Sequence, residues 1–140
     1  MANTHELAQQ WLAHLSSSLG IPSLALENGV CTLDRSGKYT VSIELDEPAA
    51  LLHVWAPLFD VGQDVETGVY ASVYEGLLME NLTQYDTGGV RFALDPVHGR
   101  LLLCASFHVG DGSGASFHKT FPHFVAAADS WFARLHGASS

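Results

Sequence analysis

The sequence predicts a single α+β domain, in which three helices accompany a twisted, mainly antiparallel sheet in the order α-β-β-β-α-β-β-α. Its 140 residues are the length of one domain. Two pairs of short alternating segments are each joined by a turn, and three other segments repeat apolar residues at helical spacing. Because no linker or repeat interrupts the chain, residues 1–140 are expected to form one domain.

The first helix is expected over 4–19. Leu7, Trp11, Leu15 and Leu19 recur every four residues, which places them on one helix face. Gly20 and Pro22 follow, as is typical just beyond a helix C-terminus.

Three strands are expected next. Segments 30–34 and 39–45 form a hairpin, and the alternation in the second indicates one buried face. Segment 50–56 is apolar on both faces, with Leu51 and Trp55 on one of them, so both faces should be covered. Pro57 is expected to end this strand because proline cannot donate to a sheet ladder.

The second helix is expected over 67–82, and its apolar residues spread over a wider arc than one core face needs. Gly68, Ser72 and Gly76 form a stripe of small residues on the remaining arc. Each glycine inside a helix costs roughly 0.5–1 kcal/mol relative to alanine. The stripe therefore favours the close approach of another backbone.

A second hairpin, 90–94 with 100–107, precedes the third helix. Thr120 is expected to cap this helix, with Pro122 tolerated in its first turn.

The charge is strongly uneven. The net charge is −9, and nine acids but no Lys or Arg lie between Lys38 and Arg91. This argues against nucleic acid and anionic membranes as partners. The acidic segment is either a solvated face or a surface that attracts a basic partner. No secretory leader or membrane segment is expected from the sequence. Cys31 and Cys104 are far apart in the chain and are expected to be core residues. We therefore expect the protein in a reducing cytoplasm.

Catalytic and cofactor motifs are weak. Residues 110–115 fit G-x-G-x-x-G/A, but a helix capped at Thr120 would start about five residues too late to bind a dinucleotide, and Asp111 would oppose the pyrophosphate. The eight histidines are scattered singly, and no serine lies in a G-x-S-x-G elbow. We expect no catalytic site, no metal and no cofactor. The loop from Gly110 to Gly114 has no assigned role.

Four features of the sequence follow a known pattern: the element order, the acidity, Leu19-Gly20-Ile21 with Leu24, and the stretch 39–59 followed by the helix through Tyr70 and Leu82. In these features the chain resembles the class I type III secretion chaperones, the CesT/SycE-like Tir chaperone family. The resemblance covers nearly the whole chain. It implies a homodimer without enzymatic activity that binds the N-terminal, non-globular segment of a secreted effector and keeps it soluble and secretion-competent in the bacterial cytoplasm. The effector would be held by apolar patches and by strand addition at a sheet edge.

The resemblance also implies two groups of site residues. The dimer axis would be approached by Gly68, Ser72, Val73, Gly76, Leu77 and Glu80. The effector groove would be bordered by Leu7, Trp11, Leu15, Ile21, Leu24, Leu51 and Trp55.

Two other functions remain open on the sequence. A small-ligand-binding or enzymatic domain would have a pocket between sheet and helices, near carboxylates or His108 and His118, and would be a monomer. An adaptor for a folded protein would use the same apolar surface without an extended groove.

Overall fold

A computed structural model describes residues 3–21, 24–60, 75, 78, 79, 90–95, 97–110 and 114–137. The elements follow in the order α1 (Thr4–Leu19), β1 (Val30–Arg35), β2 (Tyr39–Asp46), β3 (Leu51–Asp60), β4 (Arg91–Asp95), β5 (Arg100–His108) and α3 (Ala115–Gly137). The α+β class and the order of the strands are confirmed, with two helices in the described part of the chain.

The expected second helix lies almost wholly outside the described residues. Glu75, Leu78 and Met79 are the described positions of 67–82, and all three are helical. The six residues expected at a dimer axis therefore lie outside the described part: Gly68, Ser72, Val73, Gly76, Leu77 and Glu80. Of the helices that are described, none is long and apolar enough to cross a membrane.

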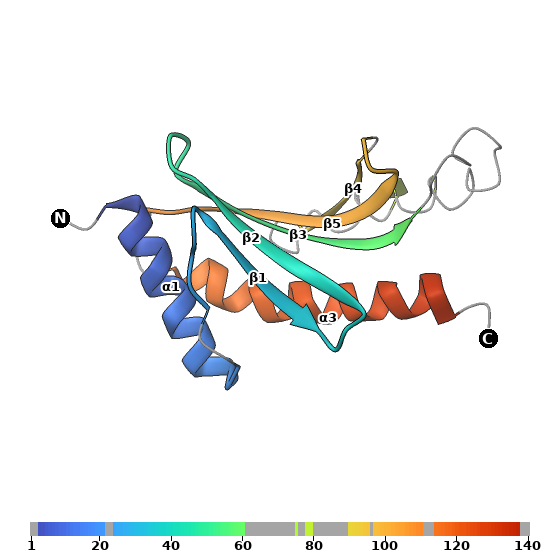
Figure 1. Cartoon of the computed structure of the whole chain (residues 1–140), viewed down its shortest axis with the longest axis horizontal. Helices are drawn as coiled ribbons and strands as arrows, with labels where there is room; N and C mark the ends of the chain where they lie inside the picture. Colours follow the sequence, from blue (N-terminus) through green and yellow to red (C-terminus); the bar gives the residue numbers. More distant parts are fainter. Residues whose placement is uncertain are drawn as a thin grey trace.

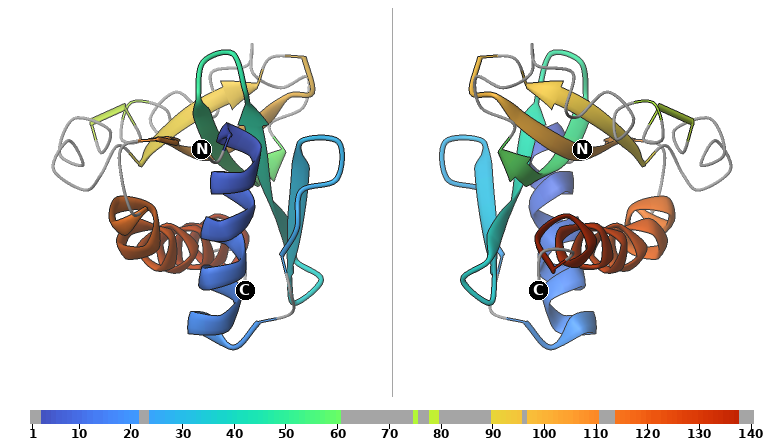
Figure 2. Two further views of the ribbon diagram at one scale, coloured as in Figure 1. Left: turned by 90° about the vertical axis from the view of Figure 1, so that its left-hand side faces the viewer. Right: turned by 90° about the vertical axis from the view of Figure 1, so that its right-hand side faces the viewer.

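The five strands form one sheet in the order β1-β2-β3-β5-β4, and every neighbouring pair is antiparallel. The expected hairpins are the pairs β1–β2 and β4–β5, and β3 with β5 forms the middle of the sheet. Figure 1 shows the sheet above α3, with α1 crossing the start of that helix. The end views in Figure 2 show the sheet twisting so that β1 and β2 turn down beside the helices. Both helices therefore cover the same side of a curved sheet.

The side of the sheet that faces the helices is the core. Along β3 every second side chain is buried, and β5 alternates in the same way. Phe117, Phe121 and Phe124 of α3 pack here and are fully buried. Each large apolar side chain that leaves water in this layer contributes about 1.5–3 kcal/mol. This packing positions the opposite side of the sheet, which α1 and α3 do not cover.

Pro57 does not end β3, contrary to the sequence expectation. The strand runs to Asp60, and its register with β5 shifts between Pro57 and Phe59. The pairing of β2 with β3 stops at Ser42 and Trp55. At Pro57, β3 therefore pairs with β5 alone. Proline has no backbone N–H to donate, and this position tolerates it because one side of the strand is not paired with β2, as at an edge strand.

The start of α3 also differs from the expectation. The helix begins at Ala115, not after Thr120, and the backbone N–H of His118 donates to the Gly114 carbonyl at 2.9 Å. Pro122 is therefore inside the helix, where it cannot supply the N–H that the His118 carbonyl would normally accept. The extra turn buries Phe117 completely, and this burial offsets the lost hydrogen bond.

A polar contact ties the first hairpin to α3. Tyr39 donates to Asp129 Oδ1 at 2.5 Å, and Arg35 Nη2 lies 2.6 Å from Asp129 Oδ2. Partial burial works against ionisation of Asp129, but the hydrogen bonds from Arg35 and Tyr39 outweigh it and hold the pKa of that carboxyl below its usual range. The contact fixes the twisted end of the sheet on the helix layer.

Candidate functional site

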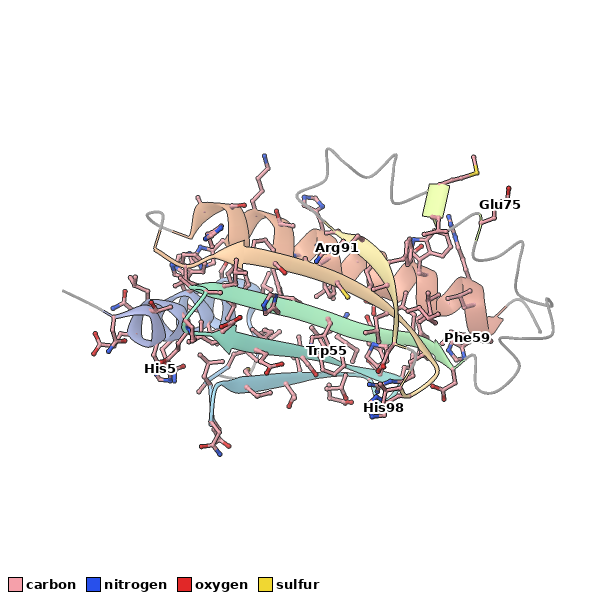
Figure 3. The ribbon with its side chains drawn as sticks, turned by 90° about the horizontal axis from the view of Figure 1, so that it is seen from above. His5, Trp55, Phe59, Glu75, Arg91 and His98 are labelled. Atoms are coloured by element: carbon pink, nitrogen blue, oxygen red, sulfur yellow. The ribbon has the colours of Figure 1, made fainter. Side chains whose placement is uncertain are left out.

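The face of the sheet that points away from the helices is the candidate functional surface, called here the open face. Its β3 side chains are Leu51, His53, Trp55 and Pro57, all of them half-buried. Figure 3 looks onto this face and shows Trp55 near the middle of the sheet, with Arg91 and His98 toward β4 and the β4–β5 turn. Apolar surface at the centre of a twisted sheet can bind another chain.

A groove of about 410 Å³ lies on the open face over β3, β5 and β4. Cys104 of β5 is paired in register with Trp55 on one side and with Arg91 on the other, so the three residues form a row across the strands. The described residues that line it are His53, Val54, Trp55, Arg91, Asp95, His98, Arg100, Leu102, Cys104, Ala105 and Ser106. An indole, aliphatic side chains and two guanidinium groups thus share one hollow.

The β4–β5 turn positions Arg100 at one end of this groove. Asp95 accepts hydrogen bonds from the backbone N–H groups of Val97 and His98 at 3.1 and 3.3 Å, as in an Asx turn. Its Oδ2 lies 2.8 Å from His98 Nδ1 and accepts from Arg100 Nη2 at 3.2 Å. The Arg100 guanidinium carbon is 5.7 Å from the centroid of the Trp55 ring, in cation–π contact. Arg100 is therefore oriented by a carboxylate and by an aromatic ring.

Asp95 is expected to make the stability of the chain depend on pH in the acid range. The hydrogen bond from His98 is the main influence that lowers the pKa of Asp95 to about 2, and it outweighs burial. A carboxyl group whose pKa is lower in the folded than in the unfolded state stabilises the fold at pH values above its unfolded pKa. This contribution is lost as the pH falls from about 4 toward 2. Urea unfolding at pH 7 and pH 2.5 should show that the difference in free energy of unfolding between wild type and Asp95→Asn is smaller at the lower pH. An unchanged difference would contradict the hydrogen-bonding role of this carboxylate.

The other end of the open face is acidic. His53 Nδ1 lies 2.8 Å from Ser106 Oγ, and Glu44 is opposite His53 in the β2–β3 register. A second hollow, of about 660 Å³, lies here at the β2–β3 turn and shares His53 with the groove. It is lined by His5, Asn28, Gly29, Glu44, Leu45, Asp46, Glu47, Pro48 and His53. Within the described ranges, no group of three or more His, Cys, Asp or Glu side chains could hold a metal ion.

The seven residues expected around an effector groove lie on different sides of the sheet. Leu51 and Trp55 are on the open face. Trp11, Leu15 and Leu24 are core residues, with 6%, 1% and 5% of their surface exposed. Leu7 and Ile21 are partly buried and pack against the same core. The open face thus brings together only the β3 members of this set.

Several groove residues were not singled out from the sequence, in particular Arg91, Arg100 and Ser106. The alternation along β5 carried a signal, because Arg100, Leu102 and Cys104 share one strand face. Their closeness to Trp55 depends on the pairing of β3 with β5, which joins segments about fifty residues apart.

The two cysteines are free thiols in different surroundings. Cys31 is buried in the core, whereas Cys104 is half-buried on the open face, so the expectation of a core position is correct for Cys31 alone. Burial raises the pKa of both thiols, which favours their neutral form.

The space between sheet and helices, where a ligand pocket was the alternative, is filled by fully buried side chains such as Leu12, Phe117 and Phe121. His118 Nε2 lies 3.1 Å from the Trp11 carbonyl oxygen at the contact of α1 with α3, and His108 is exposed at the end of β5. Neither histidine lines either hollow described above.

The glycine-rich motif at 110–115 lies closer to a helix than the sequence predicted. The helix begins at Ala115, directly after the motif, so a late helix start no longer argues against dinucleotide binding. The sheet pairing does, because β5 is antiparallel to both of its neighbours, whereas the dinucleotide fold requires parallel strands around the motif.

Comparison with known proteins identifies relatives by sequence family and by fold. The family model of the Tir chaperone protein (CesT) family matches residues 10–132. No match was found among curated proteins.

Solved structures of the same fold come from two-protein complexes, one of which is a chaperone–effector complex. A chain of the ExsC–ExsE complex has a TM-score of 0.71 at 18% identity, and the match covers 94% of this chain and 95% of that chain. A chain of the HopA1–SchA chaperone–effector complex has a TM-score of 0.67 at 16% identity, with 90% and 93% covered. A chain of the heterodimeric ExoU–SpcU complex from the type III secretion system of Pseudomonas aeruginosa has a TM-score of 0.61 at 18% identity, with 89% and 93% covered. These matches show that the fold extends over nearly the whole length of each chain.

Proposed function

The chain belongs to the Tir chaperone protein (CesT) family, and from this we propose that it is a type III secretion chaperone which binds the N-terminal, non-globular segment of a secreted effector and keeps it soluble and secretion-competent. The likeness in fold to chains of the HopA1–SchA chaperone–effector complex and of the ExoU–SpcU complex from a type III secretion system supports this function. We place the chaperone in the bacterial cytoplasm, and we assign it no catalytic role, cofactor, nucleic-acid partner or membrane partner.

The observation that carries the proposal is the half-buried apolar row on the open face, centred on Trp55. A non-globular client exposes apolar segments that aggregate unless another surface covers them. The sheet face that α1 and α3 leave uncovered provides such a surface. Tryptophan is among the residues that most often dominate the free energy of binding.

Strand addition would supplement this apolar contact. The sheet order leaves β1 and β4 at the two edges, and Val30 of β1 is 39% exposed. Backbone N–H and C=O groups of an edge strand can pair with an extended client segment. The client would then lie partly along an edge and partly across the open face.

Trp55→Asp is expected to weaken capture of the effector segment more than tenfold, because it removes the aromatic surface and places a carboxylate in the groove. Since Trp55 is half-buried on the face that α1 and α3 leave uncovered, the variant should remain folded. The affinity of purified chaperone for a candidate effector's N-terminal segment can be measured by isothermal titration calorimetry.

Leu19→Asp is the matched control, because it adds the same charge at an exposed site at the end of α1. It should bind the segment as wild type does. Equal affinities for Trp55→Asp and wild type would exclude the open face as the client surface.

The chaperone is further proposed to act as a homodimer that meets through the small-residue stripe Gly68, Ser72 and Gly76, with Val73, Leu77 and Glu80 beside it. This rests on the sequence pattern and on the family, since these residues are outside the described part of the chain. Gly76→Trp should give a monomer in analytical ultracentrifugation, because a large side chain would block the close approach of two helices. A dimer of unchanged strength in this variant would contradict the interface.

A further inference from the structure

The charges that line the groove on the open face run opposite to those of the chain as a whole. The net charge is −9, with only six Lys and Arg residues, yet two of the six, Arg91 and Arg100, line the groove beside Trp55. Among the described residues that line the groove, Asp95 is the one carboxylate, and Asp60, opposite Arg100 in register, is exposed and is not among them. Two guanidinium groups therefore lie in one groove of an acidic protein.

Arg100 is held in a way that leaves most of its donors unused by Asp95. A guanidinium carries five N–H donors in a rigid fork, and Asp95 accepts from only one terminal nitrogen. The Arg100 side chain is 28% exposed, and its position over Trp55 fixes the plane in which a ligand would meet it. A fixed, partly exposed guanidinium beside an aromatic ring suits a carboxylate attached to an apolar chain.

On the premise of the proposed function, we propose that Arg100 forms a subsite for an acidic side chain of the bound effector segment, next to an apolar side chain that packs on Trp55. The occupant is a carboxylate of Asp or Glu carried by the client. The surrounding acidity would attract a client that is basic overall, and this subsite would select one acidic position within it.

The opposite end of the open face sets the position of that carboxylate. Glu44, Asp46 and Glu47 line the other hollow, and His53 joins the two. Ser106, beside His53, is six positions along β5 from Arg100, which corresponds to about 20 Å at about 3.3 Å per residue. A client carboxylate is repelled at the acidic end and attracted at Arg100, so the charge pattern fixes the register of the segment.

Selection from a random 12-residue peptide library displayed on phage tests this subsite without a known effector. Peptides that bind wild type and are lost with Trp55→Asp should be enriched in Asp or Glu beside an apolar residue. The enrichment should disappear with Arg100→Gln. It should persist with Arg134→Gln, the matched control, because Arg134 also lies over a tryptophan ring, Trp131, but on α3.

A selected peptide then gives the size of the effect. Replacing its acidic residue by the corresponding amide should weaken binding to wild type roughly tenfold, as expected for one charge-assisted hydrogen bond. The same replacement should change binding to Arg100→Gln less than about twofold, since the partner is already absent. Arg100→Glu should select Lys or Arg at the same peptide position.

The outcomes separate the subsite from the function on which it rests. Peptides that depend on Trp55 but show no acidic preference overturn the subsite and leave the chaperone function standing. If no selected peptide depends on Trp55, the open face is not the client surface. That result overturns both the subsite and the proposed binding of the client on this face. A change of oligomeric state in Arg100→Gln, seen in ultracentrifugation, would show that a second copy of the chain occupies the groove and would overturn the subsite.

Discussion

Trp11→Asp is expected to unfold the chain, with a loss of about 5 kcal/mol or more in the free energy of unfolding. Trp11 is 6% exposed, and its ring stacks on Phe117 with centroids 5.7 Å apart. Removing a buried tryptophan side chain costs about 3–5 kcal/mol, and a buried, unpaired carboxylate adds to that cost. The sum approaches the total stability of about 5–15 kcal/mol of a typical domain. Far-UV circular dichroism and urea unfolding measure the result.

Trp55→Asp makes the same chemical change on the other side of the sheet and serves as the comparison. Trp55 is half-buried on the open face, so that variant should keep its secondary structure and lose client binding instead. A Trp11→Asp protein within about 1 kcal/mol of wild type would contradict the packing of α1 against α3.

The local elements of the fold could be predicted because their signals are local. Alternation in 39–45 gave the buried face of β2, and the spacing of Leu7, Trp11 and Leu15 gave α1. The start of α3 was missed because Pro122 is a local signal for a first turn, whereas Phe117 extends the helix through contacts with distant residues. Phe117 packs on Trp11 of α1 and on Phe107 of β5, and no short sequence window contains those partners.

The candidate site was predicted in part for the same reason. Leu51 and Trp55 were placed on one face of their strand by alternation alone, and the structure puts them on the open face. Trp11 and Leu15 were assigned to a binding surface because an apolar helix face can cover either a core or a partner. Only the burial of both side chains distinguishes these cases. Arg100 was missed because its position over Trp55 requires the long-range pairing of β3 with β5.

Gly114→Ala is expected to lower the free energy of unfolding by about 2–5 kcal/mol. Gly114 has φ +75°, a left-handed conformation that costs a residue with a Cβ about 1–2 kcal/mol. An added Cβ would lie 2.6 Å from Cε2 and 2.7 Å from Nε1 of the Trp11 ring. That ring is held by Phe117 and by the edge contact with His118, so it cannot move aside cheaply. Overpacking of this kind typically costs about 1–3 kcal/mol more.

Gly20→Ala isolates the two contributions, because Gly20 has a similar φ of +66° but no atom within 4 Å of the added Cβ. Its cost in urea unfolding should be that of the backbone conformation alone, about 1–2 kcal/mol. The difference between the two variants then measures the contact of Gly114 with Trp11. Equal costs would mean that the indole does not pack against the start of α3. A larger cost for Gly114→Ala would explain why a glycine stands at this position, since the backbone there must pass directly over the indole of α1.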